Sequence, residues 1–283
     1  MFIITGYLLI LKGWHLSLIM AVLPGIYAAR KKSGSIYYRA SITYKKKHIS
    51  LGSYPDEPTA SRAYQESRFI LDHTEITLTQ HNLFSCLPHD KFICLLNFRD
   101  NGIYFKTPIY LYKKYFEYYL AESEILKFDR DDLFFYASKK IQKKGGYLFV
   151  SDYGSQYSIL SRYGIRPFAV YGRDYRMTNA DALDFRYSNI EIINAYAGVQ
   201  KKEAANGQIV YQAKIHVNGD FVVGIYADEI SAAIAYNKAA DTLTSHGLCK
   251  TYARNYIVSM NSRQYRTAYD LISISKKLTE LAP

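Results

Sequence analysis

Cysteine is scarce in this chain of 283 residues, which contains only Cys86, Cys94 and Cys249. Their spacing is neither the paired pattern of a disulfide framework nor the Cys/His pattern of a zinc site. We therefore expect no disulfide and no structural metal, as suits a protein of the reducing cytosol.

Long apolar runs are also missing. Residues 1–24 are apolar, but Lys12, His15 and Pro24 interrupt them, and no basic segment opens the chain. No stretch approaches the length that spans a bilayer, so we expect no membrane partner. We interpret residues 1–24 as a leader that results from a start assigned too early, with Met20 as the first residue and no folding role for residues 1–19.

One stretch of the sequence, from Gly25 to Tyr64, occurs twice. Gly25 matches Gly198 and Gly52 matches Gly224, so the second copy is shorter by one residue between these points. A hairpin loop can absorb that difference. The chain therefore carries two copies of one module with other sequence between them.

The shared pattern predicts three short strands followed by a helix. Apolar residues alternate with polar ones from Ile36 to Thr43, the period of two that gives a strand one apolar face. The pair Asn218-Gly219 in the second copy is typical of a two-residue hairpin turn. Alanines then recur at helical spacing after Glu57 and after Glu229, and these acidic residues suit the start of a helix.

This pattern resembles the AP2/ERF DNA-binding domain, over roughly a third of the chain. The resemblance rests on a Gly-Ile or Gly-Val first strand, a Tyr-x-Ala-x-Ile second strand, a Leu/Val-Gly-x-Tyr third strand and an Ala-x-x-Ala-Tyr helix. It implies modules at residues 25–75 and 197–258, each with a sheet that lies in the major groove and a helix packed behind it. The family reads DNA with arginines and tryptophans, which this chain largely lacks on that face, so no base preference follows.

The residues expected to contact DNA are polar and aromatic side chains of the strands and their turns. In the first copy they are Tyr27, Arg30, Lys32, Tyr37, Arg39, Ser41, Thr43, Lys45, Lys46, Lys47 and His48. In the second copy they are Gln200, Lys202, Gln212, Lys214 and His216. We expect Arg39 and the lysine loop to contact phosphates, and Ser41 and Thr43 to affect base preference.

Charge is distributed unevenly between the two copies. The chain has a formal net charge of +11 and a pI near 9.3, which fits a polyanionic partner. Residues 25–73 carry 9 Lys and Arg against 4 Asp and Glu, whereas residues 197–258 carry 6 against 5. The first copy should therefore make most of the salt-dependent contacts with phosphate.

The sequence between the copies contains a second motif, RMTNADALDFRYSNI at residues 176–190. It resembles the core of an HNH nuclease domain at Asn179, Asp181, Leu183, Asp184, Arg186, Asn189 and Ile190. Around it we predict strands at 147–150 and 168–171, a hairpin at 156–162 and a short helix at 184–190.

Met177 stands where this family has its catalytic histidine, and Phe185 replaces an asparagine of the motif. A thioether can neither take a proton from water nor stand in for the family's His, Asp and Asn metal ligands. No histidine occurs between His89 and His216 to replace it. The resemblance therefore implies an HNH-like domain that keeps its fold and has lost cleavage.

The expected fold class is α+β, with two modules of three-stranded antiparallel sheet plus helix flanking a central α+β domain at residues 90–194, and a C-terminal helix within 259–283. We expect a cytoplasmic, nucleoid-associated protein that binds double-stranded DNA at a bipartite site, as a transcription regulator or mobile-element accessory factor. No cofactor, metal or catalytic residue is expected. One alternative is an active homing-type endonuclease with an acidic metal cluster such as Asp174, Asp181 and Asp184. Another is an integrase fragment, against which the absence of a His-x-x-Arg motif counts.

Overall fold

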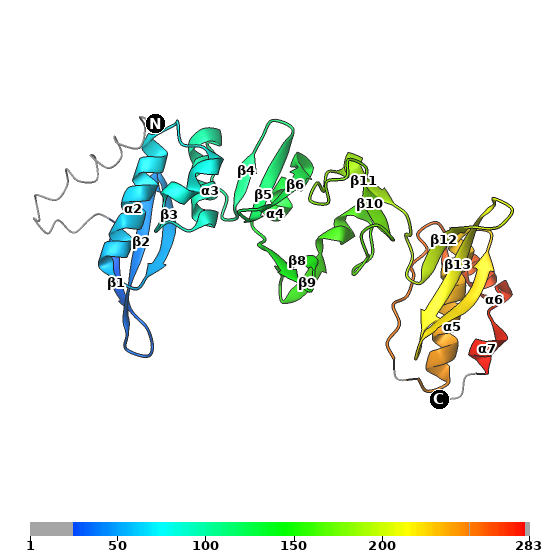
Figure 1. The fold of residues 1–283 in the computed structure, drawn as a ribbon. Helices are drawn as coiled ribbons and strands as arrows, with labels where there is room; N and C mark the ends of the chain where they lie inside the picture. The colour runs from blue at the N-terminus through cyan, green and yellow to red at the C-terminus, as the bar shows by residue number, and fades with distance from the viewer. Residues whose placement is uncertain (1–24, 249, 281–283) are drawn as a thin grey trace, which may run out of the picture. The chain divides into compact units, whose positions relative to one another are not determined.

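The computed structural model describes residues 25–248 and 250–280 (Figure 1). The expectations for residues 1–24, for Met20 as the first residue and for Cys249 lie outside the described residues. The fold is α+β, as predicted, and contains several small antiparallel sheets. Within the described ranges, no helix has the length and apolar character needed to cross a membrane. The described residues divide into two compact units, which meet between Leu111 and Tyr112.

The first module has the strand and helix order predicted from the sequence. Strands β1 (Ile26–Arg30), β2 (Ile36–Tyr44) and β3 (Lys47–Tyr54) form an antiparallel sheet in that order, and α2 (Glu57–Asp72) follows. The apolar positions of β2 and β3 lie on one face of the sheet and are buried together with Ala60 and Ala63 of α2. The period of two in the sequence thus becomes a sheet with a helix-covered inner face and an outer face.

The second module repeats this arrangement. Strands β12 (Val199–Glu203), β13 (Ile209–His216) and β14 (Asp220–Tyr226) form the sheet, and α5 (Glu229–Ser245) packs on it (Figure 1). Asp56 caps α2 by accepting a hydrogen bond from the backbone N–H of Thr59, and Asp228 caps α5 in the same way from Ser231. Both donor–acceptor distances are 2.8 Å.

A glycine begins each module because the chain there runs very close to the middle strand of the sheet. The backbone N–H of Ser41 donates to the carbonyl oxygen of Gly25 at 2.8 Å, and that of Lys214 donates to Gly198 at 2.7 Å. Gly25 has φ +90° and Gly198 has φ +71°. A Cβ atom would lie 2.1 Å from the Ser41 carbonyl oxygen in one copy and 2.5 Å from the Lys214 carbonyl oxygen in the other. Only glycine fits both the left-handed backbone and the close approach.

The first unit extends beyond the module. Its remaining elements are η1 (Leu78–Leu83), α3 (His89–Asn101) and β4 (Ile109–Leu111). Arg99 of α3 is buried and donates to the backbone carbonyls of Ile70, His73 and Ile76 at 2.6 to 2.9 Å, so α3 is fixed to the end of α2. The expected boundary near residue 90 is therefore corrected, because α3 belongs with the first module and not with the central region.

The C-terminal segment also differs from the prediction of a single helix. It forms α6 (Ser262–Leu271) and the short α7 (Lys276–Thr279). The backbone N–H of Ser275 donates to the Val223 carbonyl of β14 at 2.8 Å, and the Tyr226 hydroxyl donates to the Ser273 carbonyl at 2.7 Å. The segment between the two helices thus binds to the last strand of the second module.

The central region consists of short elements. They are β5 (Tyr115–Ala121), β6 (Glu124–Asp129), η2 (Arg130–Asp132), α4 (Leu133–Tyr136), β7 (Ile141–Lys144), β8 (Tyr147–Asp152), β9 (Ser155–Ser158), η3 (Ile159–Tyr163), β10 (Tyr175–Met177), η4 (Tyr187–Asn189) and β11 (Ile190–Ile192). The strand expected at 147–150 is β8, and the hairpin expected at 156–162 is β9 followed by η3. The strand expected at 168–171 is absent from this described stretch, and the helix expected at 184–190 is only the single turn η4.

Candidate nucleic-acid interface

The outer face of the first module, opposite α2, brings together residues from all three strands. Tyr27 of β1 pairs with Arg39 of β2, which pairs with Ser53 of β3. Further along β2 and β3, Thr43 pairs with His48. These side chains are exposed, and 49% of Tyr27 is accessible. We call this surface the first outer face.

Arg39 lies at the centre of the first outer face, and a neighbouring tyrosine holds it in place. Its Nη2 donates to the Tyr37 hydroxyl at 2.8 Å, and its guanidinium carbon lies 5.5 Å from the centre of the Tyr37 ring. A guanidinium fixed by an aromatic ring retains donors for a second partner, such as a phosphate or the edge of guanine. Arg39 is the strongest candidate contact because it is cationic, exposed and central.

The three lysines of the β2–β3 turn are not equivalent. Lys45 and Lys46 form a two-residue turn with φ of 43° and 63°, the geometry that matches the twist of a hairpin. The Lys45 ammonium donates to the Arg99 carbonyl oxygen at 3.4 Å, and the Lys47 ammonium lies 5.9 Å from the centre of the Tyr104 ring. Lys45 and Lys47 therefore also contact other parts of their own unit, whereas no such contact is recorded for exposed Lys46.

Ser41 was expected to contact DNA, and the structure corrects this. Only 3% of Ser41 is accessible, and its hydroxyl donates to the Gly25 carbonyl at 3.2 Å, so little of its surface is left for a contact with DNA. The alternation of the strand predicts the direction of this side chain but not its burial.

Arg30 and Lys32 lie at the β1–β2 end of the sheet and are exposed. Lys32 lines a shallow depression together with Lys31, Ser35, Tyr37 and Ser53. Two ammonium groups beside hydroxyl groups form a surface that suits a phosphate. The depression extends the first outer face toward this hairpin.

The second outer face, opposite α5, has a different chemistry. It contains the expected residues Gln200, Lys202, Gln212, Lys214 and His216. Gln212 was expected to contact DNA, and the structure corrects this, because Gln212 is buried and its side-chain oxygen, also buried, has no hydrogen-bond partner. Two apolar side chains lie near it on β14, Val222 with 43% and Ile225 with 62% of its surface accessible.

A hydrogen-bonded histidine–aspartate pair occupies the hairpin end of the second outer face. His216 Nδ1 lies 2.9 Å from Asp220 Oδ1, and hydrogen bonding from His216 holds the pKa of Asp220 below its usual range. Asp220 stands where the first copy has His48, and Gln212 stands where it has Arg39. The two faces share one backbone but differ in charge.

Ser53 and Ile225 are outer-face residues that sequence reasoning missed. The strand pairing slips by one residue beside Gly52, because Ala40 pairs with Gly52 while Ser41 pairs with Ser50. The same slip occurs beside Gly224 in the second copy. An extra residue shifts the alternation, so Ser53 and Ile225 point outward. A glycine inside a strand pattern was the signal for this bulge.

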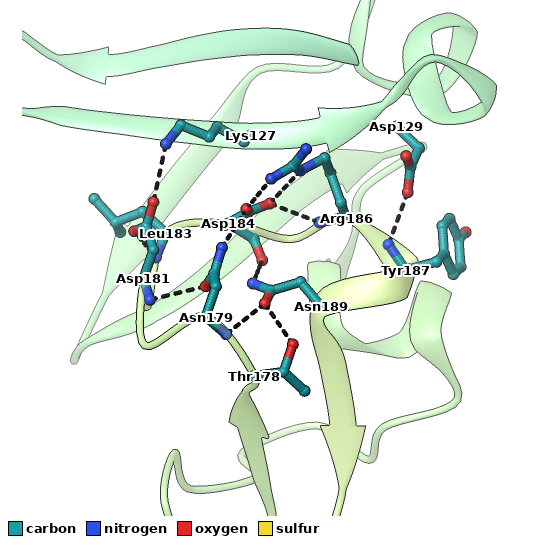
Figure 2. A network of polar contacts seen from close by, with 10 residues as sticks. All are labelled: Lys127, Asp129, Thr178, Asn179, Asp181, Leu183, Asp184, Arg186, Tyr187 and Asn189. Atoms are coloured by element: carbon teal, nitrogen blue, oxygen red, sulfur yellow. Dashed lines mark hydrogen bonds and ion pairs between the residues drawn. The ribbon is translucent and has the colours of Figure 1, made fainter. Parts of the chain in front are cut away.

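Met177 of the HNH-like motif is buried in β10, where it pairs with Ile190 of β11. The loop between these strands is held by its own polar residues (Figure 2). The Asn189 side chain accepts from the Thr178 hydroxyl at 2.8 Å and from the Asn179 backbone at 2.9 Å, and donates to the Asp184 carbonyl at 2.9 Å. The loop also pairs with β6 through two backbone hydrogen bonds at Lys127.

The carboxylates of the endonuclease alternative are each paired with cations of the chain. Asp184 binds Arg186, Asp181 binds Lys127, and Asp174 binds Arg166 and Arg173. Burial disfavours ionisation of Asp184, but hydrogen bonds from Arg186 and Asn179 outweigh it and keep its pKa below the usual range. Among the described residues, no group of three or more His, Cys, Asp or Glu side chains is arranged to hold a metal ion.

Comparisons of the chain with family models, with curated proteins and with solved structures found no match.

Proposed function

We propose that this protein binds double-stranded DNA through the outer faces of its two modules and does not cleave it. The single observation that carries this proposal is the first outer face, where Arg39 is held against Tyr37 in a row with Tyr27 and Ser53. The face is backed by a packed core, so its side chains are presented on a rigid sheet.

The first outer face suits a groove of DNA. The major groove admits a small antiparallel β-ribbon, and side chains of alternating residues then point at base edges. Cations at both ends of the sheet, Lys32 at one hairpin and Lys46 at the other, are placed to flank such a groove and contact phosphates. Phosphate neutralisation releases counterions and contributes most of the affinity that depends on salt.

The second module then contributes selectivity more than affinity. Its outer face has a half-buried amide at Gln200, apolar groups at Val222 and Ile225, and an aspartate already paired with His216. Amides read adenine and apolar groups contact the thymine methyl. Two modules on one chain bind a bipartite site with an affinity greater than either alone. Such a protein acts as a transcription regulator or as an accessory factor of a mobile element.

The central region serves as a folded spacer in this proposal. Its motif residues Asp184 and Asn189 hold the loop in shape, and Met177 offers no group that activates water. If the protein cleaved DNA, the alternative of an active homing-type endonuclease would replace this proposal.

The test is selection of bound sequences from a random duplex library by the purified full chain, followed by affinity measurements at several salt concentrations. The same sample is incubated with plasmid and Mg²⁺ or Mn²⁺. We expect bound duplexes with two conserved half-sites, and intact plasmid. Absence of duplex binding, or nicking that Asp181→Ala abolishes, would overturn the proposal.

A further inference from the structure

The central region has an open groove on one face of its β7–β8–β9 sheet. The groove has a volume of about 560 Å³, and its lining includes Lys144, Tyr147, Phe149, Gln156 and Phe168. Lys144 pairs with Tyr147 across β7 and β8, and Phe149 lies two residues further along the same face. Neither module contributes to this groove.

Phe168 forms the outer wall of the groove. Its ring meets Tyr147 edge to face with ring centres 5.2 Å apart, and meets Phe149 at 6.1 Å. Even so, 59% of Phe168 is accessible. Aromatic rings gain stability from burial, so an exposed aromatic wall leaves apolar surface for a ligand to cover.

The backbone at Phe168 is strained. Its φ is +62°, in the left-handed region that a bulky side chain rarely adopts. Such conformations persist where the surroundings enforce them, commonly at ligand sites. The ring itself remains largely exposed.

Asp174 closes the loop that carries Phe168. Only 1% of Asp174 is accessible, and its carboxylate accepts a hydrogen bond from the Val170 backbone at 2.8 Å. Arg166 and Arg173 bind the same carboxylate at 2.8 and 2.9 Å. The loop from 166 to 174 is therefore closed by a buried ionic centre, and Phe168 is presented in a fixed position before a ligand arrives.

We propose that this groove binds an unpaired nucleobase of single-stranded DNA. The aromatic walls Tyr147, Phe149 and Phe168 fit the flat face of a base, which stacks on such rings without regard to sequence. The side chain of Gln156 at the rim can pair with the polar edge of the base. The Lys144 ammonium supplies the charge that complements a phosphate. The aromatic walls, the Gln156 amide and the Lys144 ammonium together match the base and phosphate of a nucleotide. An apolar peptide would leave Lys144 without a partner.

The site is independent of the duplex-binding faces. A protein that holds an unpaired base beside two duplex-binding modules would favour DNA that is locally opened. The proposal therefore extends the protein's range from duplex to single-stranded DNA, and it can fail without affecting the proposed duplex binding.

The test is fluorescence anisotropy of a fluorescein-labelled oligothymidylate titrated with the full chain, using Phe168→Ala and its conservative partner Phe168→Tyr. Stacking on one ring contributes about 1–3 kcal/mol per base, so Phe168→Ala should weaken binding by about 5- to 150-fold. Phe168→Tyr, which keeps an aromatic ring, should bind the oligonucleotide about as well as the wild type. Lys144→Ala should weaken binding at low salt and reduce its dependence on salt.

The matched control is Tyr153→Ala. Tyr153 is fully exposed, lies in the β8–β9 turn, and also has a positive φ of 46°, but it does not line the groove. Its removal should leave oligothymidylate binding unchanged. Because alanine at 168 could disturb the loop, Phe168→Gly, which suits the left-handed backbone, serves as a second variant without the ring. Equal affinity of wild type, Phe168→Ala and Phe168→Gly would overturn the proposal, as would failure of the wild type to bind the oligonucleotide.

Discussion

The Lys45 ammonium donates a hydrogen bond to the backbone carbonyl oxygen of Arg99 at 3.4 Å. This contact ties the tip of the β2–β3 hairpin to the end of α3. Arg99 is in turn fixed to the end of α2 by three backbone carbonyls. The outer face of the first module is therefore supported from behind by α2 and at its hairpin by α3.

The first prediction separates Lys45 from Lys46. Lys45→Ala should lower the free energy of unfolding of the first unit by about 1 kcal/mol, because it removes a hydrogen bond that a charged group donates. Lys46→Ala should leave stability unchanged and weaken DNA binding, because Lys46 is exposed at the turn. Urea unfolding and duplex affinity of each variant check this. The reverse pattern would show that Lys45 is the phosphate contact.

The second prediction concerns salt. Each phosphate contact contributes about 0.9 to the slope of log affinity against log salt concentration. The double variant Arg39→Ala with Lys46→Ala should reduce the slope by about 2 and weaken binding to every duplex. Lys202→Ala with Lys214→Ala is the matched change in the second module, where the face carries fewer cations. If that change has the larger effect, the second module is the main source of affinity.

The sequence predicted the modules well because short-range patterns determine them. Alternation from Ile36 to Thr43 predicted the two faces of β2, and the two helices begin at Glu57 and Glu229, as expected. The predicted boundary at residue 90 placed the residues of α3 in the central region. The helix is buried over the whole stretch from Phe92 to Arg99. A helix without a polar stripe gives no periodic signal that shows which element it packs against.

The remaining differences depend on contacts distant in sequence. The apolar run at Phe168 to Tyr171 looked like a strand, but the buried Asp174 and its arginines fold it into a turn. Ser41 alternates toward the outer face, but it is buried and its hydroxyl donates to the Gly25 carbonyl. The local sequence pattern predicts the face of a strand on which a side chain lies, whereas the burial of that side chain depends on neighbours distant in the sequence.

The third prediction tests the packing of helix on sheet. Ala63 and Ala235 are fully buried at equivalent positions of α2 and α5. A leucine at either site should cost about 1–3 kcal/mol, because the tight contact has no room for the added atoms. Ala63→Leu should reduce hydrogen-exchange protection in the first unit only, and Ala235→Leu in the second module only. Gln65→Leu, at an exposed position of α2, is the control. Native hydrogen-exchange protection in both leucine variants would contradict this packing of helix on sheet.

The fourth prediction uses the buried carboxylate of the HNH-like loop. Asp184 is fully buried, and hydrogen bonds from Arg186 and Asn179 keep its pKa below the usual range despite burial. The native state therefore holds the ionised form more tightly than the unfolded chain, whose aspartates titrate near pH 4. The resulting stability is complete above that pH and is lost as the pH falls through the lowered native pKa.

Asp184→Asn keeps the shape of the side chain and removes its charge, so the Arg186 hydrogen bonds lose their ionic partner. At neutral pH we expect a loss of about 1.5–3 kcal/mol from the central region, the range for hydrogen bonds to charged groups. The difference between wild type and variant should shrink as the pH falls below about 4. Denaturant unfolding at a series of pH values measures it. Glu191→Gln, which removes an exposed partner of Arg176, is the control and should leave stability almost unchanged, because exposed ion pairs contribute little. A constant difference at every pH would mean that the charge of Asp184 does not hold the loop.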